Sequence, residues 1–85
     1  MAALYSIRGT YEDVMANQPE WATVKGVMVL RVKDRPFVGV PHSGRKNSRV
    51  FHIIDIDKGK EVCQLQRAEV NGWLCREALN AKAGA

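Results

Sequence analysis

The residues best suited to acid–base chemistry are His52, Asp55 and Asp57, because a histidine beside a carboxylate is a common catalytic pair. They fall in or just after the segment 50–56, whose β-branched and aromatic residues predict a strand. Residues at even separation share a face of a strand, so the two aspartates lie on one face and His52 on the other. No triad is therefore expected, and the aspartates are interpreted as leading into a turn at 57–59.

Metal and cofactor chemistry has no matching motif. Cys63 and Cys75 lie on different predicted elements, and neither belongs to a Cys-x-x-Cys pair or a Cys/His array with zinc spacing. We interpret them as reduced core thiols, which favours a cytoplasmic location, with a bridge between them as the alternative. The stretch 39–44 lacks the glycine spacing and the Lys-Ser/Thr ending of a phosphate loop. No metal, cofactor or nucleotide site is predicted.

A basic loop, residues 42–49, is the clearest candidate for binding. It holds no hydrophobic residue and is rich in Ser, Gly and Asn, so it is expected to be exposed. In consecutive antiparallel strands it lies at the opposite end of the sheet from the turns at 33–36 and 57–59. The last helix also begins at the end of the sheet that carries the basic loop, and the positive end of its dipole favours anions there. The residues predicted to bind nucleic acid or another anion are Lys25, His42, Arg45, Lys46, Arg49 and Arg67.

Two aromatic residues are weaker candidates for contact with a partner. Trp21 stands in a connecting segment and is expected either to pack over the sheet edge or to stay partly exposed. Phe37 belongs to the segment 37–40, which flanking prolines mark as a short or edge strand. An exposed edge there would suit a partner protein or a second copy of the chain.

The elements that must position these residues follow from periodicity and turn signals. We predict an α+β fold, an antiparallel sheet of two β-hairpins, with a short N-terminal helix and a C-terminal helix packed on one face. A further strand at 2–7 is permitted by alternation but not required. The predicted elements are a helix at 11–17, strands at 23–33, 37–40, 50–56 and 60–65, and a helix at 68–81.

Length and composition bound the remaining possibilities. The chain has 85 residues, 46% of them hydrophobic and 26% charged, which is enough for one core and typical of a folded domain. We expect a single domain over 1–81 and a loose tail at 82–85. No apolar run approaches the roughly 20 residues of a membrane span, and no secretory signal is recognised. The net charge of +4 favours polyanionic partners.

The leading hypothesis is a small non-enzymatic binding module that contacts nucleic acid, or a complex bearing it, through the basic loop. The alternative is an inhibitor or adaptor that binds a protein, using an exposed sheet edge or placing the loop on an acidic surface. A small enzyme using His52 is the third possibility. An unpaired edge strand would also allow a homodimer.

Overall fold

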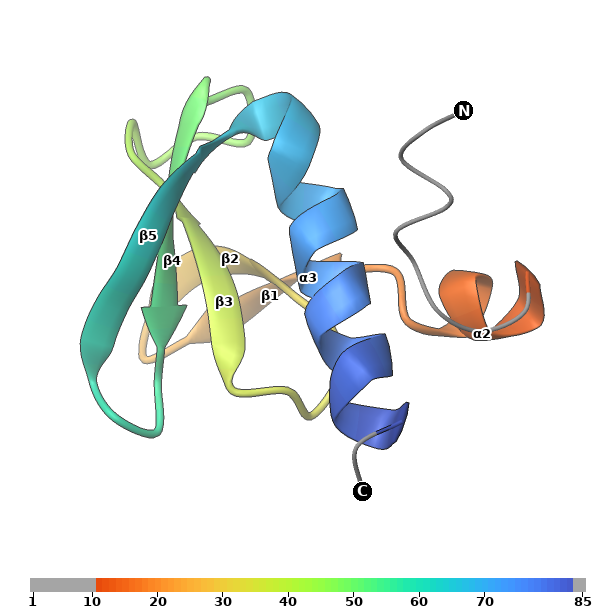
Figure 1. Ribbon diagram of the computed structural model, residues 1–85. Coiled ribbons are helices and arrows are strands. Elements are labelled where there is room, and N and C mark those ends of the chain that lie inside the picture. The colour runs from red at the N-terminus through yellow and green to blue at the C-terminus, as the bar shows by residue number, and fades with distance from the viewer. Residues whose placement is uncertain (1–10, 84–85) are drawn as a thin grey trace.

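The computed structural model describes residues 11–83, so the strand permitted at 2–7 lies outside the described part of the chain. The fold is α+β (Figure 1). Its elements in chain order are α2 (Tyr11–Ala16), β1 (Glu20–Val24), β2 (Val27–Arg31), β3 (Phe37–Pro41), β4 (Val50–Asp55), β5 (Lys60–Gln66) and α3 (Arg67–Ala83).

The five strands form one antiparallel sheet in the order β1-β2-β3-β4-β5, so each strand pairs with its neighbour in sequence. From β2 to β5 the connections alternate between the two ends of the sheet. The basic loop joins β3 to β4 at the end where β5 passes into α3, as the top of Figure 1 shows. The turns that precede β3 and β5 lie at the other end, as the alternation of strands requires.

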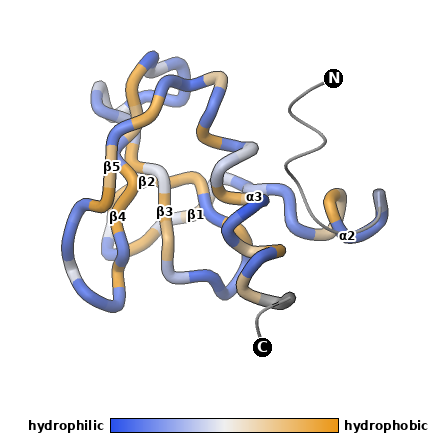
Figure 2. Tube along the Cα trace, in the orientation of Figure 1, coloured by the Kyte–Doolittle hydropathy of each residue, from blue (hydrophilic) through white to orange (hydrophobic). Residues whose placement is uncertain are grey.

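The core lies between α3 and one face of the sheet. It is built from Leu30 and Val32 of the β2 region, Phe51 and Ile53 of β4, and Val70, Leu74 and Ala78 of the helix. The strand residues alternate with outward-facing neighbours, while the helical residues recur at the spacing of one face. Figure 2 shows hydrophobic colour along parts of β4 and of α3.

The single strand predicted over 23–33 is wrong, because the chain turns back at Lys25 and Gly26 to form the β1–β2 hairpin. Both turn residues have positive φ, 51° and 80°, the left-handed conformation that a two-residue hairpin turn requires. Gly26 adopts this conformation without steric cost, but Lys25 does not. Because Lys25 stands where Asn or Asp is usual, the turn lacks the common Asn-Gly or Asp-Gly signal. The predicted pairing of β2 with β3 is confirmed, but over only two residue pairs.

Of the two alternatives predicted for 37–40, a short strand or an edge strand, the short strand is confirmed and the edge strand is wrong. β3 is the central strand, hydrogen-bonded to β2 on one side and β4 on the other. Pro36 precedes the strand and Pro41 is its last residue, so both prolines stand where a missing N–H interrupts little of the ladder. The edges of this sheet are β1 and β5, and Phe37 is not an edge residue.

The other elements agree closely with the sequence-based predictions. The second hairpin, the turn between its strands, the short helix and the C-terminal helix are all confirmed. The C-terminal helix extends to Ala83, into the predicted tail at 82–85, and 84–85 lie outside the described part. Within residues 11–83, no helix combines the length and the apolar character needed to cross a membrane.

Candidate nucleic-acid interface

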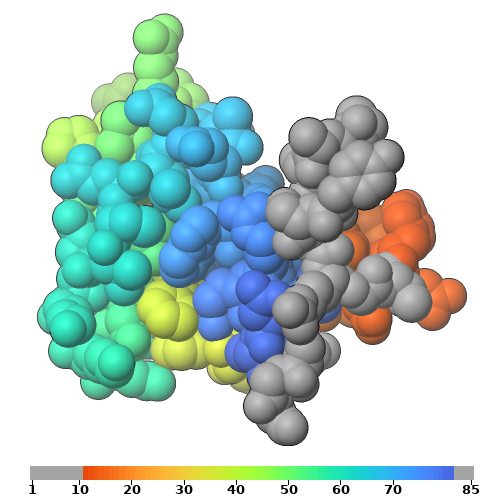
Figure 3. All heavy atoms as spheres, in the orientation of Figure 1, coloured from red at the N-terminus to blue at the C-terminus, as the bar shows by residue number. Residues whose placement is uncertain are grey.

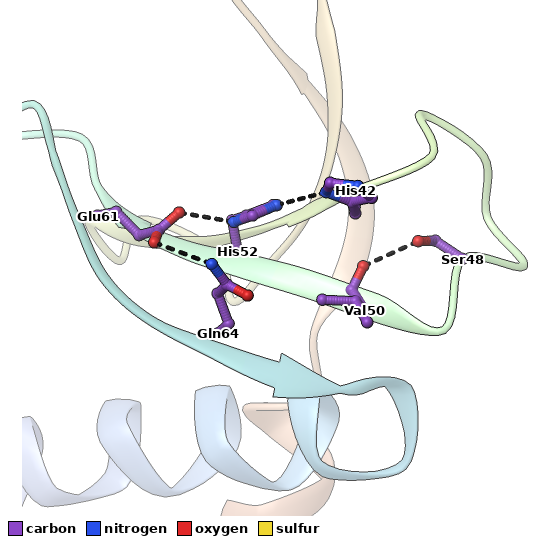
Figure 4. Close-up of polar contacts among 6 residues, drawn as sticks. All are labelled: His42, Ser48, Val50, His52, Glu61 and Gln64. Carbon is purple, nitrogen blue, oxygen red and sulfur yellow. Dashed lines mark hydrogen bonds and ion pairs between the residues drawn. The ribbon is translucent and has the colours of Figure 1, made fainter.

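The basic loop is braced from within by one buried side chain, Ser48. Its hydroxyl donates a hydrogen bond to the carbonyl oxygen of Val50 at 2.8 Å and accepts one from the N–H of Ser43 at 3.2 Å. The N–H of Gly44 donates to the carbonyl of Pro41 at 3.0 Å, and Gly44 has a φ of 77° that suits glycine. The loop therefore has a hydrogen-bonded frame, of which Figure 4 shows the contact between Ser48 and Val50.

Arg67 fastens the loop to the start of α3. Its backbone N–H donates to the carbonyl of Arg49 at 2.9 Å, and its guanidinium donates to the carbonyl of Lys46. Glu69, in the first turn of the helix, accepts a hydrogen bond from the N–H of Gln66 at 3.0 Å. This contact caps the helix as an N-terminal carboxylate should.

Trp21 completes the cluster from β1. Its side chain is half-buried, its ring centroid lies 6.2 Å from that of Phe51, and the ammonium of Lys46 stands 5.6 Å from its ring centroid. That distance is within the range of a cation–π contact. A hollow of about 80 Å³ opens beside the indole, lined by Trp21, Leu30, Arg67 and Asn71. The aromatic ring, the loop and the helix start thus meet at one place.

The cations of this cluster are exposed and lack ion-pair partners. Arg45, Lys46, Arg49 and Arg67 are all exposed, and among residues 11–83 no acidic side chain forms an ion pair with any of them. Figure 3 shows the loop protruding beyond the body of the molecule. A surface of this kind can approach a polyanion without first breaking internal salt bridges.

The other end of the sheet differs in its charge pattern. There the guanidinium of Arg35 contacts the carboxylate of Glu77 at 2.5 Å, and this hydrogen bond raises the pKa of Arg35. Asp34, Asp57 and Lys58 stand in the turns of the same end. Cations and carboxylates lie close together here, so the positive charge is largely compensated.

Two predicted site residues lie apart from the cluster. Lys25, in the β1–β2 turn, lines an apolar hollow with Ile54 and Ile56, which stand at the far end of β4 from the basic loop. β2 pairs with β3 over only two residue pairs, so the β1–β2 hairpin is not held beside β3 along the whole strand. Phe37 packs edge-on against Trp73, with ring centroids 5.6 Å apart, and belongs to the edge of the core.

His42 begins the basic loop and joins a polar chain that the sequence did not indicate (Figure 4). Its Nδ1 lies 2.8 Å from Nε2 of His52, and Nδ1 of His52 lies 2.6 Å from the carboxylate of Glu61. Gln64 contacts the other oxygen of Glu61 at 3.5 Å. The residue spacing gave no signal for Glu61, because the contact depends on a β-bulge in β5.

Asp55 has the turn role that the sequence predicted. It is buried, and its Oδ1 accepts hydrogen bonds from the N–H groups of Asp57 and Lys58 at 3.0 and 3.2 Å. It takes no part in the polar chain of His52. Within residues 11–83, no group of three or more His, Cys, Asp or Glu side chains is arranged to hold a metal ion.

Comparison with known proteins gives no functional assignment for this chain. No protein-family model, curated protein or solved structure matches the chain.

Proposed function

We propose that this chain is a small, non-enzymatic binding module that holds nucleic acid through the basic loop. The observation that carries the proposal is a set of exposed cations on a braced loop, with Arg67 at its base, that form no ion pair within residues 11–83. Arginine and lysine on such a surface match the phosphate backbone, which supplies most of the affinity in sequence-independent binding. The loop's hydrogen-bonded frame supports the proposal, because pre-organised cations lose less conformational entropy on binding.

The chemistry around the loop favours phosphate contact over base reading. No helix or strand carries these cations into a position to enter a groove, since they stand on a loop and on the first residue of α3. Trp21 offers one aromatic face beside them, partly covered by Lys46. We therefore expect little sequence preference, with a Kd of about 10⁻⁴–10⁻⁶ M at physiological salt.

The test replaces Arg45, Lys46 and Arg49 together by alanine and measures binding to labelled random oligonucleotides by fluorescence anisotropy at several salt concentrations. The three loop cations and Arg67 would make four phosphate contacts, which give a slope of log K against log salt of about −3.6 on duplex DNA. In the variant only Arg67 remains, so the slope should flatten to about −1. Affinity should fall at low salt in parallel. The free energy of unfolding should change by less than about 1 kcal/mol, because the three side chains are exposed.

A matched control removes the same charge from the other end of the sheet, by changing Lys33, Lys58 and Lys60 to alanine. These lysines are exposed, and the set leaves the Arg35–Glu77 ion pair intact. It should keep most of the affinity and most of the salt slope. Equal losses in the two variants would show that only net charge matters, and the basic loop would then be rejected as the site.

A protein with an acidic surface is the other partner that these cations could meet. Capture from the native host with and without nuclease separates the two classes. A partner protein retained after nuclease treatment, together with an absence of oligonucleotide binding by the purified chain, would contradict the nucleic-acid proposal.

A further inference from the structure

A chain of three polar side chains crosses the face of the sheet that points away from α3. His52 lies between Phe51 and Ile53, whose side chains belong to the core under the helix, so its own side chain points to the opposite face. Figure 4 shows His52 between Glu61 and His42, with a contact on each of its ring nitrogens. The sequence contains only these two histidines, and the fold brings their rings to a centroid distance of 5.1 Å.

Glu61 fixes the tautomer of His52. A carboxylate only accepts hydrogen bonds, so the 2.6 Å contact requires Nδ1 of His52 to carry the proton. In the neutral ring, Nε2 of His52 then presents a lone pair toward His42. Nδ1 of His42 stands 2.8 Å from Nε2 of His52 and donates a hydrogen bond to it.

We propose that His42 and His52 form a two-imidazole site for a divalent transition-metal ion, with Glu61 as the positioning residue for His52. A carboxylate that orients a ligating histidine through its second ring nitrogen is a recurrent arrangement in metal sites. Two nitrogens that bind one ion at about 2.0–2.1 Å in tetrahedral geometry stand about 3.3 Å apart. The present separation is about half an ångström shorter, and the exposed ring of His42 can move to supply the difference.

Binding changes the tautomer of one ring only. When Nδ1 of His42 binds the ion, its proton moves to Nε2, while His52 keeps its proton on Nδ1 against Glu61. The ligating atoms are therefore Nδ1 of His42 and Nε2 of His52, an unequal pair. The side chain of His52 is 23% exposed and His42 lies at the surface, so water can complete the coordination shell.

The chemistry of the ligands selects the class of ion. Imidazole suits Cu²⁺, Ni²⁺ and Zn²⁺, whereas Mg²⁺ and Ca²⁺ prefer oxygen ligands. The cations of the neighbouring basic loop oppose a positive ion, so we expect moderate affinity, with a Kd below about 0.1 mM. The metal site shares only His42 with the basic loop and does not depend on the proposed function, whose test leaves His42 unchanged.

The first experiment titrates the full chain with Ni²⁺ by isothermal titration calorimetry in a non-chelating buffer, with Mg²⁺ as the control ion. The parent should bind one Ni²⁺ and no Mg²⁺. His52→Gln and His42→Gln should each abolish saturable binding, and Glu61→Gln should weaken it about 10–100-fold, as expected for loss of an orienting carboxylate. Glu20→Gln, which removes an exposed carboxylate from β1, is the matched control and should bind as the parent does.

The second experiment adds Zn²⁺ to ¹⁵N-labelled protein and reads the ring nitrogens by NMR. The proposal requires coordination shifts at Nδ1 of His42 and Nε2 of His52, with Nδ1 of His52 still protonated. The site is overturned if the parent shows no saturable Ni²⁺ binding with a Kd below about 0.1 mM. It is equally overturned if His52→Gln binds as tightly as the parent, or if Zn²⁺ shifts a different pair of nitrogens.

Discussion

Gly39, on the central strand β3, lies where Val70 of α3 packs closely on the sheet. A Cβ atom added there would lie 3.0 Å from Cγ1 of Val70, 3.6 Å from Phe51 and 3.7 Å from Leu30. Val70 is fully buried, so its methyl group has no open space into which to turn. The change Gly39→Ala should therefore strain the contact between helix and strand.

The magnitude follows from two opposing effects. Overpacking of a well-packed core costs about 1–3 kcal/mol. Alanine also removes the entropic disadvantage of glycine in a strand, which offsets about 0.5–1 kcal/mol. The net loss in the free energy of unfolding should be about 1–2 kcal/mol, measured by urea unfolding with far-UV circular dichroism.

A double-mutant cycle makes the prediction specific to the contact with Val70. Val70→Ala alone should cost about 2–3 kcal/mol, because it removes two buried methyl groups and leaves a cavity. It also removes the Cγ1 atom that the new Cβ would meet. In that background Gly39→Ala should change sign and stabilise the protein by about 0.5 kcal/mol. An equal loss in both backgrounds would show that the helix does not approach β3 at Val70.

Two further predictions concern Trp73 and the cysteines. Trp73→Ala should destabilise the domain by about 3 kcal/mol, because the half-buried indole packs on Phe37, whereas the exposed Tyr11→Ala should shift the melting temperature little. Both thiols are free, and burial raises the pKa of each, so mass spectrometry without reductant should find no bridge, and alkylation should modify Cys63 before the buried Cys75. Because these folded-state pKa values are raised, the stability that the neutral thiols contribute should be lost as pH rises through them; a bridge, or faster alkylation of Cys75, would contradict these assignments.

The elements that the sequence predicted well are those specified by local signals. The second hairpin carries β-branched runs on either side of Asp57-Lys58-Gly59, and Asp55 adds the side-chain hydrogen bonds that hold the turn. The C-terminal helix shows apolar residues at helical spacing, and the core confirms Val70 and Leu74. In each case the residues that determine the element also lie within it.

The β1–β2 hairpin escaped prediction because its turn uses Lys25 at a left-handed φ that lysine rarely adopts. The surrounding run of β-branched residues continued across the turn and resembled one strand. The sequence-based prediction therefore grouped Lys25 with the basic loop, whereas in the structure Lys25 lies near Ile54 and Ile56. Trp21, on the other end of β1, lies beside the basic loop and contacts Lys46.

The polar chain ending at Glu61 depends on an irregularity of the sheet. In a regular strand, Glu61 and Gln64 would lie on opposite faces, since they are three positions apart. The register of β5 shifts between Ile53 and Ile54, so Glu61 pairs with Ile54 while Gln64 pairs with His52. Val62 is the extra residue, and its side chain is 48% exposed. The contact of His52 with Glu61 therefore depends on how β4 and β5 pair. The spacing of histidines and acidic residues along the chain does not encode this register, so it predicted neither the contact nor the proposed metal site.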